Sequence, residues 1–311
     1  SSDLDGAQVY SEVLNQVARP GDINQGGRGT CTVTTMEHLQ ATREPAEYVR
    51  LLSGLTSAEG SVVLRNGEKL SRDTGLVAPD DSGRTAASRV YQASMMEFAN
   101  GPDQDYRNEK DGHFRKDGAP ILDDRGKLSQ GLSMEKLAKV SSAAMEGDFQ
   151  HKQGTLGSNG KPSFMDSLLL ASPVTLPLYL MRSSKSDQIT ADISQALSQK
   201  QSVQVGMRWS RNVDDRDGYH ALSLYKMDDK YVYLRNPWGQ GEQGETNPNT
   251  GVVRQALPRD PKENPVSGGF GFSGQPAVDP SLPTGEAGTL RMKKEDFYAN
   301  LAGYAVQSGG K

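Results

Sequence analysis

Cysteine is almost absent from this chain, which contains one cysteine and four histidines among its 311 residues. A single cysteine excludes an internal disulfide, and it excludes zinc or iron–sulfur sites that are built from several cysteines. Hydrophobic residues are also scarce, at 34%, and aromatic residues make up only 6%. Because the apolar residues are clustered and glycine and proline are frequent, we expect a loop-rich globular fold rather than a disordered chain.

The chain also lacks an excess of positive charge and long apolar runs. Its net charge is −4 and its isoelectric point is about 5.7, so we expect neither nucleic acid nor an anionic lipid surface as a partner. The longest apolar stretch, residues 168–181, contains prolines and polar residues and is shorter than the roughly 20 residues of a membrane span. The start at Ser1, without an initiator methionine or a signal-like segment, predicts a domain excised from a longer protein.

The two halves of the chain differ in their apolar pattern. Apolar residues recur at three- and four-residue spacing in the first half and alternate in the second half, which predicts helices followed by strands. The fold class is therefore expected to be α+β. We divide the chain into a mainly helical part, 1–160, with an exposed polar insertion at 102–130, and a β-rich part, 161–311, with a long Gly/Pro-rich loop at 239–288.

Individual elements follow from the same patterns. The expected helices cover residues 7–17, 45–55, 85–100, 133–145, 186–199 and 294–301. The expected strands cover residues 202–209, 219–226, 230–235 and 289–292. Ser82 is the expected N-cap of the helix at 85–100.

The only cysteine, Cys31, follows a glycine-rich loop. Residues 22–31 read D-I-N-Q-G-G-R-G-T-C, and a helical pattern begins at or just after Thr30. The first turn of a helix carries unpaired N–H groups and a partial positive charge. Together with a nearby imidazolium, this environment lowers a thiol pKa from ~8.5 to ~3.5–7.5. The position alone leaves open a small buried hydrophobe, which is what most free cysteines are.

Other polar residues occur in a fixed order around this cysteine. Gln25 precedes Cys31 by six positions, His220 lies in a predicted strand, and Asn236 begins Asn-Pro-Trp-Gly sixteen positions after the histidine. This ordered set resembles the papain-like cysteine peptidases, and most closely their calpain branch. The segment 288–297, G-T-L-R-M-x3-D-F, is also similar to the strand and helix that close a calpain core.

The resemblance implies a papain-like two-lobed fold and a role for each residue. The helical left lobe would carry Cys31 as the nucleophile, and the β-sheet right lobe would carry His220 and Asn236. His220 would take the thiol proton and later protonate the leaving amine, while Asn236 would orient the imidazole. Gln25 and the backbone N–H of Cys31 would form the oxyanion hole.

Three further residues would support this site. Trp238 would shield the bond between histidine and asparagine from water, and Gly218 would let the substrate backbone approach the histidine strand. Gly29, two positions before the cysteine, belongs to the loop pattern.

The chain departs from the family in three ways. Thr32 follows the nucleophile, where papain and calpain relatives have tryptophan. His220 lies 189 residues after Cys31, beyond the ~130–150 of papain-type enzymes, and we assign the excess to the polar insertion. The acidic turn at 214–217 places an arginine where an alternating calcium loop needs a ligand, so the calcium that calpains use has no ligand motif here.

The predicted function is a thiol endopeptidase that hydrolyses protein or peptide substrates through an acyl-enzyme at Cys31, without a cofactor. Two alternatives stay open. The same residues can deamidate or transamidate a glutamine of a partner protein, and a binding module can keep this fold without activity. An excised domain of this kind would suit a cytoplasmic protein or a secreted bacterial effector.

Overall fold

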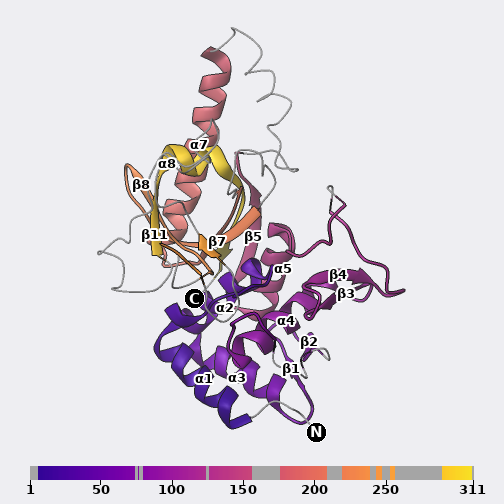
Figure 1. Cartoon of the computed structure of the whole chain (residues 1–311). Helices are drawn as coiled ribbons and strands as arrows, with labels where there is room; N and C mark the ends of the chain where they lie inside the picture. Colours follow the sequence, from indigo (N-terminus) through magenta and orange to yellow (C-terminus); the bar gives the residue numbers. More distant parts are fainter. Residues whose placement is uncertain are drawn as a thin grey trace.

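A computed structural model describes residues 6–73, 76, 80–123, 126–155, 176–208, 219–238, 243–246, 253–255 and 289–309 (Figure 1). The helices are α1 (Gly6–Ala18), η1 (Pro20–Asp22), α2 (Cys31–Arg43), α3 (Pro45–Thr56), α4 (Ala86–Asn100), α5 (Met134–Ala144), α7 (Leu176–Ser198) and α8 (Lys294–Asn300). The strands are β1 (Ser61–Val63), β2 (Lys69–Ser71), β3 (Gln104–Arg107), β4 (Gly112–Arg115), β5 (Asp148–Gln153), β6 (Val203–Arg208), β7 (Tyr219–Met227), β8 (Tyr231–Arg235), β9 (Gln243–Thr246), β10 (Val253–Gln255), β11 (Thr289–Lys293) and β12 (Leu301–Ser308).

The mixed α+β class predicted from the sequence is confirmed. All of the expected helices and strands occur close to their expected bounds, except that α7 begins ten residues earlier, at Leu176. Pro177 lies in the first turn of α7, where a missing N–H costs no hydrogen bond. The N-cap of α4 was assigned wrongly to Ser82: the hydroxyl of Thr85 accepts the N–H of Ser88 at 3.0 Å instead.

The helical part packs around α2. Every residue of α2 from Cys31 to Ala41 is buried, so this helix lies inside the protein rather than on its surface. Apolar side chains of α1, α3, α4 and α5 form one core with it, including Met36, Tyr48 and Tyr91. A helix enclosed in this way is held firmly at its first residue, Cys31.

The six-stranded sheet has the order β11-β8-β7-β6-β12-β5, and all of its neighbouring pairs are antiparallel. A second core joins side chains of this sheet to Ile193 of α7 and Phe297 of α8. Toward the helical part, β7 packs against α2 (Figure 1). There the hydroxyl of Thr35 donates to the carbonyl oxygen of Ala221 at 3.2 Å. The sheet therefore contacts the helix that begins with the cysteine.

The expectation that residues 102–130 are exposed holds only in part. This segment contains the β3–β4 hairpin, and Tyr106, Asp111 and His113 are buried. His113 Nδ1 lies 2.9 Å from Asn100 Nδ2, and Asp111 binds the loop before Cys31. Some polar side chains of this segment therefore serve as buried hydrogen-bond partners.

The sequence patterns gave no expectation of β5 and β12. Strand β5 belongs to residues 1–160 but forms an edge of the sheet. The proposed boundary at residue 160 and most of the loop 239–288 lie outside the described residues, apart from β9 and β10. Among the described helices, none is long and apolar enough to cross a membrane.

Candidate active site

The loop before Cys31 lies close against the segment that precedes α4. Gly26 has a φ of +55°, and a Cβ atom at this position would lie 2.0 Å from the carbonyl oxygen of Ser82. The same carbonyl accepts the N–H of Gly27 at 2.8 Å. Both the left-handed backbone and the close approach require glycine at position 26.

Asp111 fixes the other end of this loop. The N–H of Gly29 donates to both carboxylate oxygens of Asp111, at 3.0 and 2.9 Å, and a Cβ at Gly29 would lie 2.7 Å from Cβ of Gln130. The hydroxyl of Tyr106 donates to the same carboxylate at 2.9 Å. Asp111 itself adopts a φ of +49°, an uncommon conformation for a residue with a side chain. The insertion therefore supplies a residue that determines the loop geometry.

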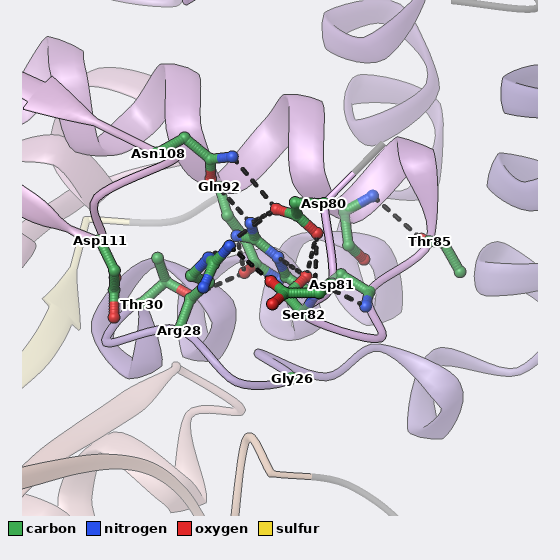
Figure 2. Close-up of polar contacts among 12 residues, drawn as sticks. Gly26, Arg28, Thr30, Asp80, Asp81, Ser82, Thr85, Gln92, Asn108 and Asp111 are labelled. Carbon is green, nitrogen blue, oxygen red and sulfur yellow. Dashed lines mark hydrogen bonds and ion pairs between the residues drawn. The ribbon is translucent and has the colours of Figure 1, made fainter. Parts of the chain in front are cut away.

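An ion-pair cluster lies behind the loop (Figure 2). The Arg84 side chain is fully buried and contacts Asp80 Oδ2 at 2.5 Å and Asn108 Oδ1 at 2.7 Å. The Arg84 guanidinium and nearby donors lower the pKa of Asp80 against the opposing effect of burial. Arg28, in the loop, contacts the exposed Asp81 at 3.0 Å. The cluster thus connects the loop to α4 and to the β3–β4 turn.

Cys31 is the first residue of α2 and is 9% exposed. The backbone N–H groups of Ala221, Thr32 and Cys31 itself lie near enough to the thiol to lower its pKa. Burial raises the pKa of the thiol, the negative charge of Asp111 raises it further, and the backbone N–H groups oppose both effects. Since Ala221 directly follows His220, the structure places the thiol against the strand that carries the predicted histidine.

His220 and Asn236 meet at one end of the sheet because β7 begins where β8 ends, with Ser223 paired to Arg235. His220 Nε2 lies 2.7 Å from Asn236 Oδ1. The Trp238 ring covers the imidazole with a centroid distance of 4.4 Å and an interplanar angle of 32°. Histidine and asparagine are both buried.

The backbone N–H of Trp238 settles which imidazole nitrogen carries the proton. It donates to Asn236 Oδ1 at 3.0 Å, so this atom of the amide is the oxygen. An oxygen that accepts from Trp238 can also accept from His220, which makes Nε2 of the histidine the donor. In the neutral ring, Nδ1 then carries no hydrogen and is the nitrogen that can take a proton from a thiol.

The pKa values of Cys31 and His220 differ from the expectation of a lowered thiol pKa beside an imidazolium. Burial lowers the pKa of His220 to about 4, although the bond to Asn236 works in the opposite direction. Burial raises the pKa of Cys31. Both shifts favour the uncharged form because the site is shielded from water. At neutral pH these shifts favour a thiol beside a neutral imidazole.

Gln25 is buried and makes hydrogen bonds both to the loop before Cys31 and to the loop after Asn236. Its backbone N–H donates to the carbonyl oxygen of Pro237 at 2.8 Å, and its side-chain Nε2 donates to the carbonyl oxygen of Arg28 at 2.6 Å. An amide nitrogen has two hydrogens, so one N–H of Gln25 is left for another acceptor. Its Oε1 is buried without a hydrogen-bond partner in the part of the chain that the structure describes.

Arg235 supports the contact between Gln25 and Pro237. Its side chain is fully buried, and Nη2 donates to the carbonyl oxygens of Gly21 at 3.0 Å and Ile23 at 2.5 Å. The residue before Asn236 thus holds the segment before Gln25. A charge-assisted bond of this kind is stronger than one between neutral groups.

The structure brings together Cys31, His220, Asn236, Gln25, Gly29 and Trp238, all predicted from the sequence. Gly218 and the acidic turn at 214–217 lie outside the described residues. Thr32 is buried in α2. Within the described residues, no three His, Cys, Asp or Glu side chains gather as a metal site.

Sequence reasoning missed three residues that hold the site: Asp111, Arg235 and Gln92. Asp111 stands in a turn of the polar insertion, where composition indicated solvent exposure. Arg235 carried one signal, a charged residue at the end of an apolar strand directly before Asn236. Gln92 carried none.

Two comparisons by sequence find no relative of this chain. A scan of the chain against models of protein families finds no match, and a search among curated proteins finds no similar sequence. The function therefore has to be inferred from the residues and the geometry of the site.

Proposed function

We propose that this protein is a thiol endopeptidase with a papain-like two-lobed fold, closest to the calpain catalytic core. The observation that carries the proposal is the bond of 2.7 Å between His220 and Asn236 under the Trp238 ring, beside a cysteine at the first residue of a buried helix. The order of these residues in the sequence and their meeting in space support the same chemistry.

Acylation begins with proton transfer from Cys31 to Nδ1 of His220. The sulfur attacks the carbonyl carbon of the peptide bond, and a tetrahedral intermediate forms. The C–N bond then breaks while His220 gives its proton to the leaving amine, which leaves a thioester on Cys31. In the second half, His220 takes a proton from water, the hydroxide attacks the thioester, and the carboxylic acid leaves as the thiol is restored.

The oxyanion of the tetrahedral intermediate needs fixed donors. The backbone N–H of Cys31 and the second N–H of the Gln25 amide are the proposed pair. The bond from Gln25 to the carbonyl of Arg28 fixes the plane of this amide, so the remaining N–H has a defined direction. One such donor contributes about 2.7–4 kcal/mol to the transition state in a comparable enzyme.

Peptide mass spectrometry of a cell lysate tests this proposal. The lysate is incubated with the wild-type protein or with the Cys31→Ala variant, each with and without a calcium chelator. We expect new peptide termini with the wild type that are missing with Cys31→Ala. Glutamine-to-glutamate changes or new isopeptide links that depend on Cys31 would overturn the peptidase in favour of a deamidase or transamidase. No change that depends on Cys31 would favour a binding module.

A further inference from the structure

Gln92, in the middle of α4, is completely buried. The nitrogen and the oxygen of its side-chain amide each make two hydrogen bonds. Its Nε2 donates to the carbonyl oxygen of Asn24 at 3.1 Å and to Glu37 Oε2 at 2.8 Å. Its Oε1 accepts from the hydroxyl of Thr30 at 2.7 Å and from Nη1 of Arg84 at 3.2 Å. The side chain therefore makes the full set of four hydrogen bonds that an amide allows.

Two of these bonds reach the two ends of the loop before the nucleophile. Asn24 directly precedes Gln25, and Thr30 directly precedes Cys31. A third bond holds Glu37, six residues further along the helix that Cys31 begins. One side chain thus holds the oxyanion donor, the nucleophile and the nucleophile helix relative to each other.

We propose that Gln92 is a positioning residue that fixes the distance between the oxyanion donor Gln25 and the nucleophile Cys31. The catalytic part of this inference, that Gln92 affects the rate of peptide hydrolysis, rests on the proposed function. Its structural claim, that Gln92 holds Cys31 in place, is testable without any substrate.

The orientation of the Gln92 amide is itself fixed by its neighbours. Arg84 can only donate hydrogen bonds, so the amide atom that faces it must be Oε1. Arg84 is in turn held by Asp80 and Asn108 in the cluster of Figure 2. Since the amide cannot flip without placing two donors face to face, its contacts with Asn24 and Thr30 are specific for glutamine.

Replacing Gln92 with methionine keeps the size and removes all four hydrogen bonds. The loop can then shift at both ends, and a displacement of about 1 Å from the productive geometry costs roughly 10²-fold in rate. We expect Gln92→Met to lower kcat by about 10²-fold while KM changes less than about threefold, because Gln92 lies inside the protein and does not contact substrate.

Gln40 offers a matched control on the nucleophile helix. It is also a completely buried glutamine. Its Nε2 donates to the carbonyl oxygen of Ala144 at 2.8 Å, and its Oε1 accepts from the hydroxyl of Tyr91 at 2.6 Å. Neither partner belongs to the loop before Cys31. The variant Gln40→Met therefore has the destabilising effect of a lost buried amide without the effect on the loop.

Alkylation of Cys31 by iodoacetamide gives a readout that needs no peptidase activity. In the wild type, His220 assists removal of the thiol proton, and this assistance depends on the position of Cys31. We expect alkylation of Gln92→Met to be at least about tenfold slower than that of the wild type, and alkylation of Gln40→Met to stay within about twofold. Thermal unfolding of both variants shows whether they are equally folded.

A glutamate at position 92 still accepts from Thr30 and Arg84 but loses the bonds to Asn24 and Glu37, and its carboxylate faces the Glu37 carboxylate. Gln92→Glu should therefore also lower kcat. If Gln92→Met does not fold, Thr30→Val removes the bond at the nucleophile end alone and should also slow alkylation. Wild-type alkylation rates in these folded Gln92→Met or Thr30→Val proteins would overturn the inference. A wild type without peptidase activity but with the expected alkylation pattern would overturn only the proposed function.

Discussion

The backbone N–H of Gln25 donates a hydrogen bond to the carbonyl oxygen of Pro237 over 2.8 Å. This bond joins the loop that leads to Cys31 with the loop that carries Asn236. The buried Arg235 side chain reinforces it from the strand side. Cys31 and His220 come from parts of the chain 189 residues apart, and this junction is one of the contacts that hold them in register.

His220 should matter more than Asn236. In the proposed mechanism His220 carries the proton in both steps, so we expect His220→Ala to lower kcat by about 10³-fold or more. Asn236→Ala should cost at least about tenfold less, because the Trp238 ring still covers the imidazole and Nδ1 can still accept a proton. Steady-state kinetics on one peptide substrate measures both, and equal losses would contradict the assigned roles.

The pKa shifts predict a broad pH profile. His220 has a lowered pKa of about 4, so activity should fall only as the pH drops through about 4, where the base becomes protonated. The pKa of Cys31 is raised above its ordinary value of 9.0, so the thiolate should form only above that pH. The ultraviolet absorbance of the thiolate, taken as the difference between wild type and Cys31→Ser, measures this ionisation. A thiolate midpoint below pH 7 would show that the ion pair forms in spite of burial.

After burial, which is the largest cause, Asp111 should contribute to the raised thiol pKa of Cys31. Its negative charge raises the thiol pKa, while its oxygens hold the N–H of Gly29. The variant Asp111→Asn keeps one acceptor for Gly29 and removes the charge, so the thiol pKa should fall. The pH dependence of iodoacetamide alkylation measures it. An unchanged or higher thiol pKa in a folded Asp111→Asn protein would refute this electrostatic role.

Gly26 should tolerate no side chain. In Gly26→Ala the new Cβ would meet the Ser82 carbonyl oxygen at 2.0 Å in addition to a positive φ. Gly67 is the matched control, because it has a φ of +87° but nothing within 4 Å of the added atom. Gly67→Ala should lower the free energy of unfolding by about 1–3 kcal/mol through backbone strain alone, and Gly26→Ala should lower it further. Urea denaturation compares the two, and equal losses would mean that the contact with Ser82 relaxes freely.

The elements that depend on local pattern could be predicted from the sequence. The glycine run before Cys31 and the apolar spacing after it indicated the start of α2, and alternation indicated the β7–β8 hairpin that brings His220 and Asn236 together. Strand β12 could not be anticipated in the same way, because it is defined by pairing with β5 and β6, which are distant in sequence.

Buried polar contacts could not be predicted from the sequence, for a related reason. Gln92 and Asp111 look like surface residues in a helix and in a charged segment, since polarity normally indicates exposure. Only the enclosed position of α2 turns them into interior partners of the loop. The sequence thus predicted which residues meet in the proposed site, whereas it did not predict the residues that hold them.

Burst kinetics with p-nitrophenyl acetate test the central claim most directly, namely that Cys31 forms a thioester with the help of His220. The account predicts a rapid release of one equivalent of p-nitrophenol, followed by a slow phase, and an acetyl group on the Cys31 peptide after acid quench. The burst should vanish in Cys31→Ser and slow strongly in His220→Ala. A wild-type protein that shows no burst and no acetyl group on Cys31, although Cys31 is open to iodoacetamide, would contradict the account.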